Sequence, residues 1–342
     1  LVGPIITLDA DINLGGMVID PEPGGPRVRP PFDWPAPSNG QNYSIGSVDE
    51  THTLNFAPDS TIIVSEGDVT FRASITGAPD IEHTAKTVFD PNYGEGHLYF
   101  APTNGATMDI GTITKNPGLF RPKSDWLILG GNTSGNTVEN AMGSNLSIVF
   151  KVDFSNGGAN GSDWTLAESV NWGAPVDVDE GTLIFNGADN STGNVSVADG
   201  GKLVAGGDWS AGSFLVESGG AIAPGGSIGT LSVDSSLVEL QNGAIYEWEV
   251  GGSGAGITSD VLASVDAGGT LTVGDIALKV IDTGSALAFG DQIPVFTYSG
   301  ARSLGSVTID LTETSFTGPG SLIDDGSGTI SVSYTHLRAH ET

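Results

Sequence analysis

Three features of the 342-residue sequence predict an all-β protein with a parallel β-helix (solenoid) region of about five coils, preceded by an irregular β-rich segment. Glycine is abundant, at 51 residues, and many apolar residues are Val, Ile or Leu, which favours short strands and tight turns over helices. Apolar and polar residues alternate in several short runs. A short glycine motif recurs between residues 178 and 275, as is typical of stacked coils.

Residues 1–165 are expected to form the irregular segment. Ile6 to Leu14 alternates between apolar and polar residues, which predicts one half-buried strand. Seven prolines within residues 21–37 oppose both helix and sheet pairing and predict a loop. Further strands are expected at 61–65, 69–75, 98–100, 126–129 and 146–152.

The repeat region is expected at 166–290. Here the pattern Val-x-x-Gly, followed closely by Leu or Ile, recurs with variations and with spacings of 19, 19, 24 and 25 residues between its first glycines. A coil of this length cannot bury its apolar face alone and stacks on its neighbours, and a repeated corner favours glycine because it adopts positive φ without strain. We therefore expect corresponding corners of a parallel β-helix at Gly181, Gly200, Gly219, Gly243 and Gly268. The alternative fold is an antiparallel sandwich with similar turn spacing.

The end of the chain divides into two parts. Residues 291–332 are expected to form a C-terminal β segment. The composition then changes after Val332, and two of the five histidines, His336 and His340, lie in the last ten residues. Residues 333–342 resemble a non-native read-through tail, so we expect this tail to be unpacked and dispensable and its histidines not to act as ligands.

Part of the repeat region resembles a known family. Gly219 to Val233 (GGAIAPGGSIGTLSV) is similar to the GGxLxPGxSxGTLxV signature of the autotransporter-associated β-strand repeat. Ser259 to Leu262 (SDVL) stands where that family has an S-D-x-L element, and 268–271 and 289–296 continue the likeness. The resemblance covers residues 178–300. It implies an exported bacterial protein, extracellular or on the outer-membrane surface, whose coils form a structural or adhesive stalk.

A second resemblance concerns anchoring. Asp324 to Val332 (DDGSGTISV) is similar to the strand that precedes a PEP-type C-terminal sorting signal, which the tail would have replaced. The chain shows no C-terminal membrane barrel of the autotransporter kind and no apolar run of 18 residues, so no direct membrane insertion of this segment is expected.

Charge and composition exclude several functions. The chain has 41 acidic and 12 basic residues, for a formal net charge of −29, and no basic patch, which disfavours nucleic acid as a partner. The absence of cysteine excludes disulfides, thiolate metal sites and thiol nucleophiles. Residues 152–332 contain 23 acidic residues but only three basic ones, Lys202, Lys279 and Arg302, so an anionic polysaccharide would be repelled.

No catalytic, cofactor-binding or metal-binding residue is predicted, and the chain is expected not to be an enzyme. The carboxylate pairs Asp177/Asp179, Glu247/Glu249 and Asp324/Asp325 fit solvated strand faces. His52, His83 and His97 are isolated, and the calcium-loop-like Asp9, Asp11 and Asn13 lack the glycine that such a loop needs. No cofactor is expected.

One alternative function remains from the sequence, a carbohydrate-binding or carbohydrate-active module for neutral glycans. Glu247 and Glu249 flank Trp248, and a tryptophan beside carboxylates can bind sugar. Five further tryptophans, Trp34, Trp126, Trp164, Trp172 and Trp209, are expected mostly to pack in the core or at edges. Cell-surface or extracellular glycans are therefore the expected partners under either function.

Overall fold

The computed structural model describes the strands between Ile5 and Val152 with short flanking pieces, and most of residues 162–334 apart from 168–174, 186, 188, 192, 253–255, 285–290, 313 and 315–319. Residue contacts divide the chain into two compact units, unit 1 (Leu1–Leu183) and unit 2 (Ile184–Thr342). This division lies further along the chain than residue 166, where the sequence predicts the repeats to begin.

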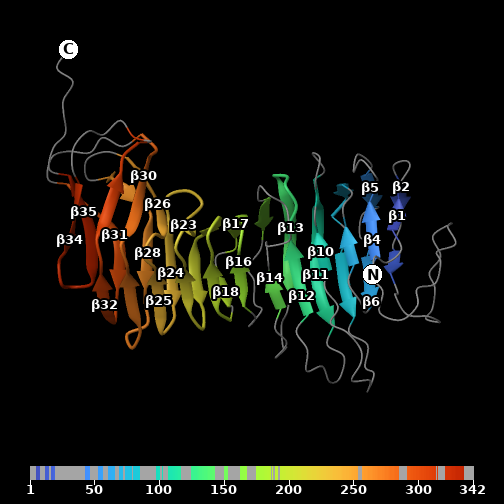
Figure 1. Ribbon diagram of the computed structural model, residues 1–342, viewed down its shortest axis with the longest axis horizontal. Coiled ribbons are helices and arrows are strands. Elements are labelled where there is room, and N and C mark those ends of the chain that lie inside the picture. Colours follow the sequence, from blue (N-terminus) through green and yellow to red (C-terminus); the bar gives the residue numbers. More distant parts are fainter. Residues whose placement is uncertain are drawn as a thin grey trace, which may run out of the picture. The chain divides into compact units, whose positions relative to one another are not determined.

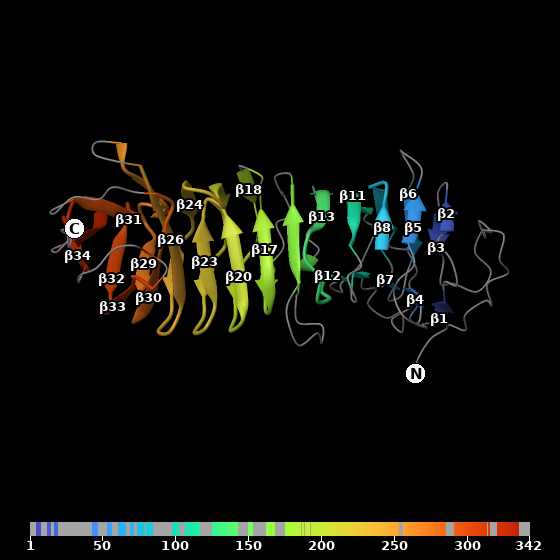
Figure 2. The same ribbon diagram turned by 90° about the horizontal axis from the view of Figure 1, so that it is seen from above.

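In unit 2 the chain passes through three sheets in turn, and the strands of each sheet pair in parallel with strands of the next coil (Figures 1 and 2). The first sheet contains β19 (Val195–Val197), β22 (Phe214–Val216), β25 (Leu237–Leu240), β29 (Thr270–Val273) and β32 (Ala301–Leu304). The second contains β20 (Gly201–Ala205), β23 (Ala221–Pro224), β26 (Ile245–Gly251), β30 (Ile276–Asp282) and β33 (Val307–Asp310). The third begins with β18 (Asp189–Ser191), β21 (Gly207–Ser210), β24 (Thr230–Asp234), β28 (Val261–Ser264) and β31 (Gln292–Tyr298).

This winding is a parallel β-helix, so the predicted fold class is confirmed. Within the described part of 178–275 the antiparallel pairing is confined to β27 (Thr258–Ser259), which pairs with the end of β26. The antiparallel-sandwich alternative is therefore wrong.

The third sheet of unit 2 ends in antiparallel strands. β31 pairs with β35 (Thr329–Tyr334), which in turn pairs with β34 (Gly320–Asp324). Ser333 is only 8% exposed and lies opposite both Gln292 and Ser321, and Tyr334 lies opposite Gly320. The expected tail therefore starts two residues too early, because β35 pairs on both sides through Ser333. Residues 335–342, including His336 and His340, lie outside the described residues.

We expect two truncations to separate strand from tail. Deleting 335–342 should leave the midpoint of chemical denaturation unchanged, whereas deleting 333–342 should lower it, because Ser333 and Tyr334 lose backbone pairing in β35. Equal midpoints for the two truncated chains would contradict the pairing, and a loss on removing 335–342 alone would show that the tail is structural.

Unit 1 shows the same type of winding. Its first sheet contains β1 (Ile5–Thr7), β4 (Tyr43–Gly46), β7 (Val69–Phe71), β10 (Leu98–Phe100), β12 (Asp125–Leu129), β14 (Phe150–Val152) and β16 (Val176–Val178). The second contains β3 (Met17–Ile19), β6 (Thr61–Ser65), β9 (Asp80–Thr84), β11 (Asp109–Asn116), β13 (Asn136–Met142) and β15 (Asp163–Leu166). A third, three-stranded sheet contains β2 (Ile12–Leu14), β5 (Thr53–Phe56) and β8 (Ser74–Thr76). β17 (Gly181–Phe185) spans the division between the units.

Two expectations for residues 1–165 need correction. The strands described there pair in parallel, coil on coil, so this segment is more regular than its sequence suggests. The run Ile6 to Leu14 contributes two strands, β1 and β2, to different sheets, and 69–75 is likewise divided between β7 and β8. Alternation continues across a corner and so does not show where a strand ends. The proline-rich 21–37 lies outside the described residues.

Aromatic rings fill the interior of each unit. In unit 1, Phe71 and Phe100 occupy the same position on successive coils and stack with centroids 5.2 Å apart. In unit 2, the Trp209 ring makes edge contacts with Phe185 at 4.9 Å and Phe214 at 6.4 Å. Stacking of like residues on neighbouring coils follows from parallel in-register pairing, since equivalent side chains lie one above another.

A buried amide joins three coils of unit 1. Asn136 is fully buried, and its Oδ1 accepts the N–H of Met108 at 3.1 Å. Its Nδ2 donates to the carbonyls of Thr133 at 3.0 Å and Asp163 at 3.1 Å. The amide therefore satisfies backbone groups that the corner would otherwise leave unpaired.

Three of the five predicted corner glycines stack directly on one another, and a fourth, Gly181, has the positive φ expected of such a corner. Gly181 has φ +77° and is the first residue of β17, which follows the corner after β16. Gly200, Gly219 and Gly243 have φ from +83° to +87°, and each is the third residue of a four-residue turn between the first and second sheets. Their stacking is direct, since the N–H of Gly200 donates to the carbonyl of Gly219, and that of Gly219 to the carbonyl of Gly243.

Gly268 is the exception. The residue stacked on Gly243 is Asp275, whose carbonyl accepts the Gly243 N–H at 2.7 Å. Gly268 instead lies between β28 and β29, at the corner that joins the third sheet to the first. The similar motif therefore serves two different corners.

Candidate functional site

The strand β26 carries the carboxylate pair that the sequence marks as a candidate sugar site. Tyr246, Trp248 and Val250 are fully buried, while Glu247 and Glu249 alternate with them on the outer face. This is the side-chain arrangement predicted from the alternation of residues 246–250. The chemistry that Glu247 and Glu249 can perform then depends on what surrounds each carboxylate.

Glu247 belongs to an ion-pair ladder across the second sheet. It lies opposite Lys279 on β30, with 3.6 Å between Lys279 Nζ and Glu247 Oε1, and its Oε2 also contacts Lys202 of β20. On the next strand, β33, Asp310 lies opposite Lys279. Hydrogen bonds from Thr312 and the charge of Lys279 lower the pKa of Asp310. With ammonium groups from two strands around it, Glu247 acts as a link between strands and is poorly placed to exchange a proton with a substrate.

Asp260 is the most unusual carboxyl group among the described residues. It precedes β28 and is only 1% exposed. Its Oδ1 accepts the N–H of Gly229 and its Oδ2 accepts the N–H of Glu249, both at 2.9 Å. Its own N–H donates to the Glu249 carbonyl at 2.9 Å, and its carbonyl accepts the Trp248 Nε1–H at 2.9 Å. One residue thus ties β26 and β28 to the segment before β24.

These contacts explain two sequence motifs at once. Asp260 belongs to the S-D-x-L element and Gly229 to the PGxSxGTL element. The sequence places them 31 residues apart, and parallel pairing of β24 with β28 brings them together. The aspartate completes the backbone hydrogen bonding of the glycine turn on the preceding coil, which is a structural role.

The surroundings of Asp260 change its acidity. Burial raises the pKa of Asp260 from 3.8 to about 7, against the opposing effect of the two N–H donors, and the negative charge of Glu249 adds to the rise. Burial and the charge of Asp260 also raise the pKa of Tyr246 well above 10.0. The Tyr246 hydroxyl donates to the Val295 carbonyl at 3.2 Å, and its ring stacks on Phe296 at 5.1 Å. This cluster is enclosed in the core.

The other two carboxylate pairs lie in different settings. Asp324 accepts hydrogen bonds from Arg302 Nε at 2.5 Å and from the Tyr298 hydroxyl at 3.1 Å, and Arg302 lies over the Tyr298 ring at 5.0 Å. Asp325 accepts hydrogen bonds from the N–H groups of Ser327 and Thr329, which organises the turn between β34 and β35. Asp177 lies on β16, and Asp179 follows that strand.

The tryptophans described with their side chains are packed inside. Trp164, Trp209 and Trp248 are at most 1% exposed, and each indole N–H donates to a backbone carbonyl, at Gly130, Gly206 and Asp260 respectively. The expectation of core packing is confirmed for these three. Trp248 therefore cannot act as a sugar platform beside Glu247 and Glu249. The side chain of Trp126 and all of Trp34 and Trp172 lie outside the described residues.

The remaining sequence candidates are only partly covered. His83 lies on β9, whereas His52, His97 and the residues Asp9 and Asp11 lie outside the described residues. Among the residues that the structure describes, no group of three or more His, Cys, Asp or Glu side chains is placed to hold a metal ion. The described part of the chain also contains no helix that is long and apolar enough to span a membrane.

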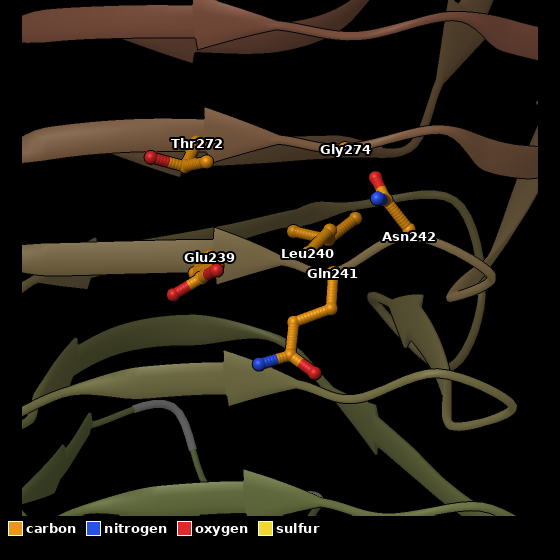
Figure 3. Close-up of a pocket in the computed structure, with 6 residues that line it drawn as sticks. All are labelled: Glu239, Leu240, Gln241, Asn242, Thr272 and Gly274. Atoms are coloured by element: carbon orange, nitrogen blue, oxygen red, sulfur yellow. The ribbon is translucent and has the colours of Figure 1, made fainter.

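A hollow on unit 2 was not anticipated from the sequence. It has a volume of about 320 Å³ and lies where β25 and β29 turn toward the second sheet (Figure 3). It is lined by Glu239, Leu240, Gln241, Asn242, Thr272 and Gly274. The only sign of this hollow in the sequence is the pair of polar residues Gln241 and Asn242 directly after β25. The pairing of β25 with β29 is what brings Glu239 and Thr272 together.

Comparison of the sequence with known protein families found no matching family model. Comparison with curated proteins found no matching sequence. The resemblance to the autotransporter-associated repeat therefore stays a prediction from the sequence alone.

Proposed function

We propose that this chain is part of an exported bacterial surface or secreted protein and acts as a structural and adhesive β-helix element without catalytic activity. The observation that carries the proposal is the coil-to-coil construction of unit 2, in which parallel pairing and buried contacts join each coil to the next. Such a scaffold keeps its shape over many coils because every coil supports its neighbours. This property suits a stalk.

The charge distribution supports a surface role. Lys202, Lys279 and Arg302 each lie within ion-pair distance of a carboxylate of unit 2, so their charges contribute to holding strands together. The chain keeps a formal net charge of −29, which favours solubility and opposes self-association at an exposed surface. An outer-membrane or extracellular location agrees with this chemistry.

The alternative, a carbohydrate-active module, is less well supported. Inverting and retaining glycosidases need a proton-donating acid and a second carboxylate across the scissile bond. Glu247 is engaged by two lysines, and the Trp248 between the two glutamates is buried. Glycan binding without turnover remains compatible with an adhesive element.

The enzymatic alternative has a direct test. We expect the purified chain to release neither reducing ends nor unsaturated products from a panel of neutral and uronate polysaccharides. Glu247→Gln and Glu249→Gln should behave like the wild type, with the exposed Asp208→Asn as control. Turnover by the wild type that both glutamine variants abolish, and the control retains, would overturn the structural proposal, because a mechanistic carboxylate cannot lose its charge without losing its function.

The location is tested by recovering the complete reading frame and labelling intact cells with an antibody against unit 2. A secretion signal together with surface labelling is the expected result. An attached hydrolase domain, or labelling only after the cells are opened, would contradict the stalk.

A further inference from the structure

The hollow on unit 2 lies beside a glycine corner that follows the first sheet. The residues that follow the first-sheet strands stack in a column, coil on coil. The backbone N–H of each one donates to a carbonyl of the preceding coil, with the pairs Glu217 to Val197, Gln241 to Val216, and Gly274 to Leu240. Gly305 continues the column, since its N–H donates to the Val273 carbonyl, so two of these coils carry a long side chain and the next two carry only a hydrogen atom. The bare backbone of Gly274 forms part of the wall of the hollow, beside Asn242 (Figure 3).

No side chain can fill this position without disturbing the corner. A Cβ atom at Gly274 would come within 2.5 Å of Asn242 Oδ1 and 2.7 Å of Asn242 N. Asn242 is itself held, because its Oδ1 accepts the N–H of Asp275 at 2.8 Å. The space beside Gly274 is therefore filled by Asn242, which is held in place as one wall of the hollow. The volume of the hollow, about 320 Å³, is at the lower end of the range for small-ligand sites.

The side chains around the hollow offer both donors and acceptors. Glu239 and Thr272 lie directly opposite each other on β25 and β29 and are half-exposed. Within the part of the chain that the structure describes, the side chains of Glu239, Gln241 and Thr272 make no hydrogen bond. The side-chain Oδ1 of Asn242 accepts the N–H of Asp275, which leaves the Nδ2 hydrogens of Asn242 as donors.

We propose that this hollow binds one hydroxyl-rich unit of a neutral glycan. A sugar hydroxyl both donates and accepts, which matches a carboxylate, two amides and a threonine hydroxyl placed side by side. The acidic surface repels anionic sugars. A divalent cation needs six or more oxygen ligands, usually from several carboxylates, whereas Glu239 is the one carboxylate in the lining. The inference depends on the adhesive part of the proposed function and specifies the chemistry of its ligand.

The test titrates the full chain with malto-, cello-, xylo- and manno-hexaose, with hexagalacturonate and Ca²⁺ as separate probes, using calorimetry and the amide signals of Asn242 and Gly274. At least one neutral hexaose should bind and shift both amide signals. Glu239→Ala and Thr272→Val should each weaken binding about tenfold, which corresponds to the loss of one hydrogen bond or more to the ligand. Asp208→Ala, an exposed change on the third sheet, should bind like the wild type.

Three results would overturn this site. They are the absence of binding to every neutral hexaose, binding that Glu239→Ala and Thr272→Val leave unchanged, and a shift of the same amide signals by Ca²⁺ or hexagalacturonate alone. Circular dichroism of each variant separates lost binding from lost structure. A failure here, with surface labelling still positive, would remove the glycan site and leave the stalk in place.

Discussion

The free energy of unfolding is expected to contain a contribution from Asp260 that falls as the pH rises from about 4 to about 7. Burial raises the pKa of Asp260 from 3.8 to about 7 in the folded chain, whereas the unfolded chain ionises near the ordinary value. Between these two values the folded state keeps a proton that the unfolded state has lost, so rising pH favours unfolding. At about 1.4 kcal/mol per pKa unit, the loss amounts to a few kcal/mol and stops above the folded pKa.

Chemical denaturation between pH 4.5 and 8.5 measures this contribution as a difference between variants. Asp260→Asn keeps one hydrogen-bond acceptor but cannot ionise. The free energy of unfolding that this variant loses relative to the wild type should therefore be largest at low pH and should shrink as the pH rises. Asp234→Asn, at an exposed position, serves as the control for the other carboxylates and should run parallel to the wild type. Parallel curves for Asp260→Asn and the wild type would show that Asp260 does not titrate in this range.

Asp260→Ala should be more damaging at every pH. It leaves the N–H groups of Gly229 and Glu249 without their acceptor, at about 1–3 kcal/mol for each buried donor. Comparison of the alanine and asparagine variants therefore separates the hydrogen-bonding role of Asp260 from its ionisation.

Gly225→Ala is expected to destabilise unit 2 by about 3 kcal/mol or more. Gly225 has φ +94°, and a Cβ atom there would lie 2.1 Å from Ser227 O and 2.8 Å from Gly229 N. Both atoms are backbone atoms of the same tight turn, so they cannot move aside without breaking it. The cost therefore includes both the strained φ and the steric overlap.

The neighbouring glycine provides a matched control. Gly226 has φ +62°, where an alanine costs about 1 kcal/mol, and its nearest contact would be Val204 Cγ1 at 3.3 Å. Denaturation midpoints should therefore fall in the order wild type, Gly226→Ala, Gly225→Ala. Similar losses for the two alanine variants would mean that positive φ alone explains the double glycine and that the backbone overlap is relieved.

Local periodicity predicted the parts of the fold that depend on neighbouring residues. Alternation in 246–250 placed Trp248 inward and Glu247 outward, because successive side chains of a strand face opposite sides. The glycine spacing located the stacked turns at Gly200, Gly219 and Gly243, because each is the position of positive φ in a four-residue turn. The same reasoning failed at Gly268, since a glycine pattern records the need for a turn and not which corner of the coil contains it.

The sequence by itself therefore determined the all-β class, the winding into coils and the inward or outward direction of strand residues, all of which follow from short-range pattern. Only the tertiary structure decided that Asp260 completes the turn at Gly229, that Glu247 links Lys202 to Lys279, and that Glu239 and Thr272 line one hollow. These contacts join residues on different strands through the register of parallel pairing. Register depends on the length of every coil, and coil length varies through features such as β27 that no local pattern records.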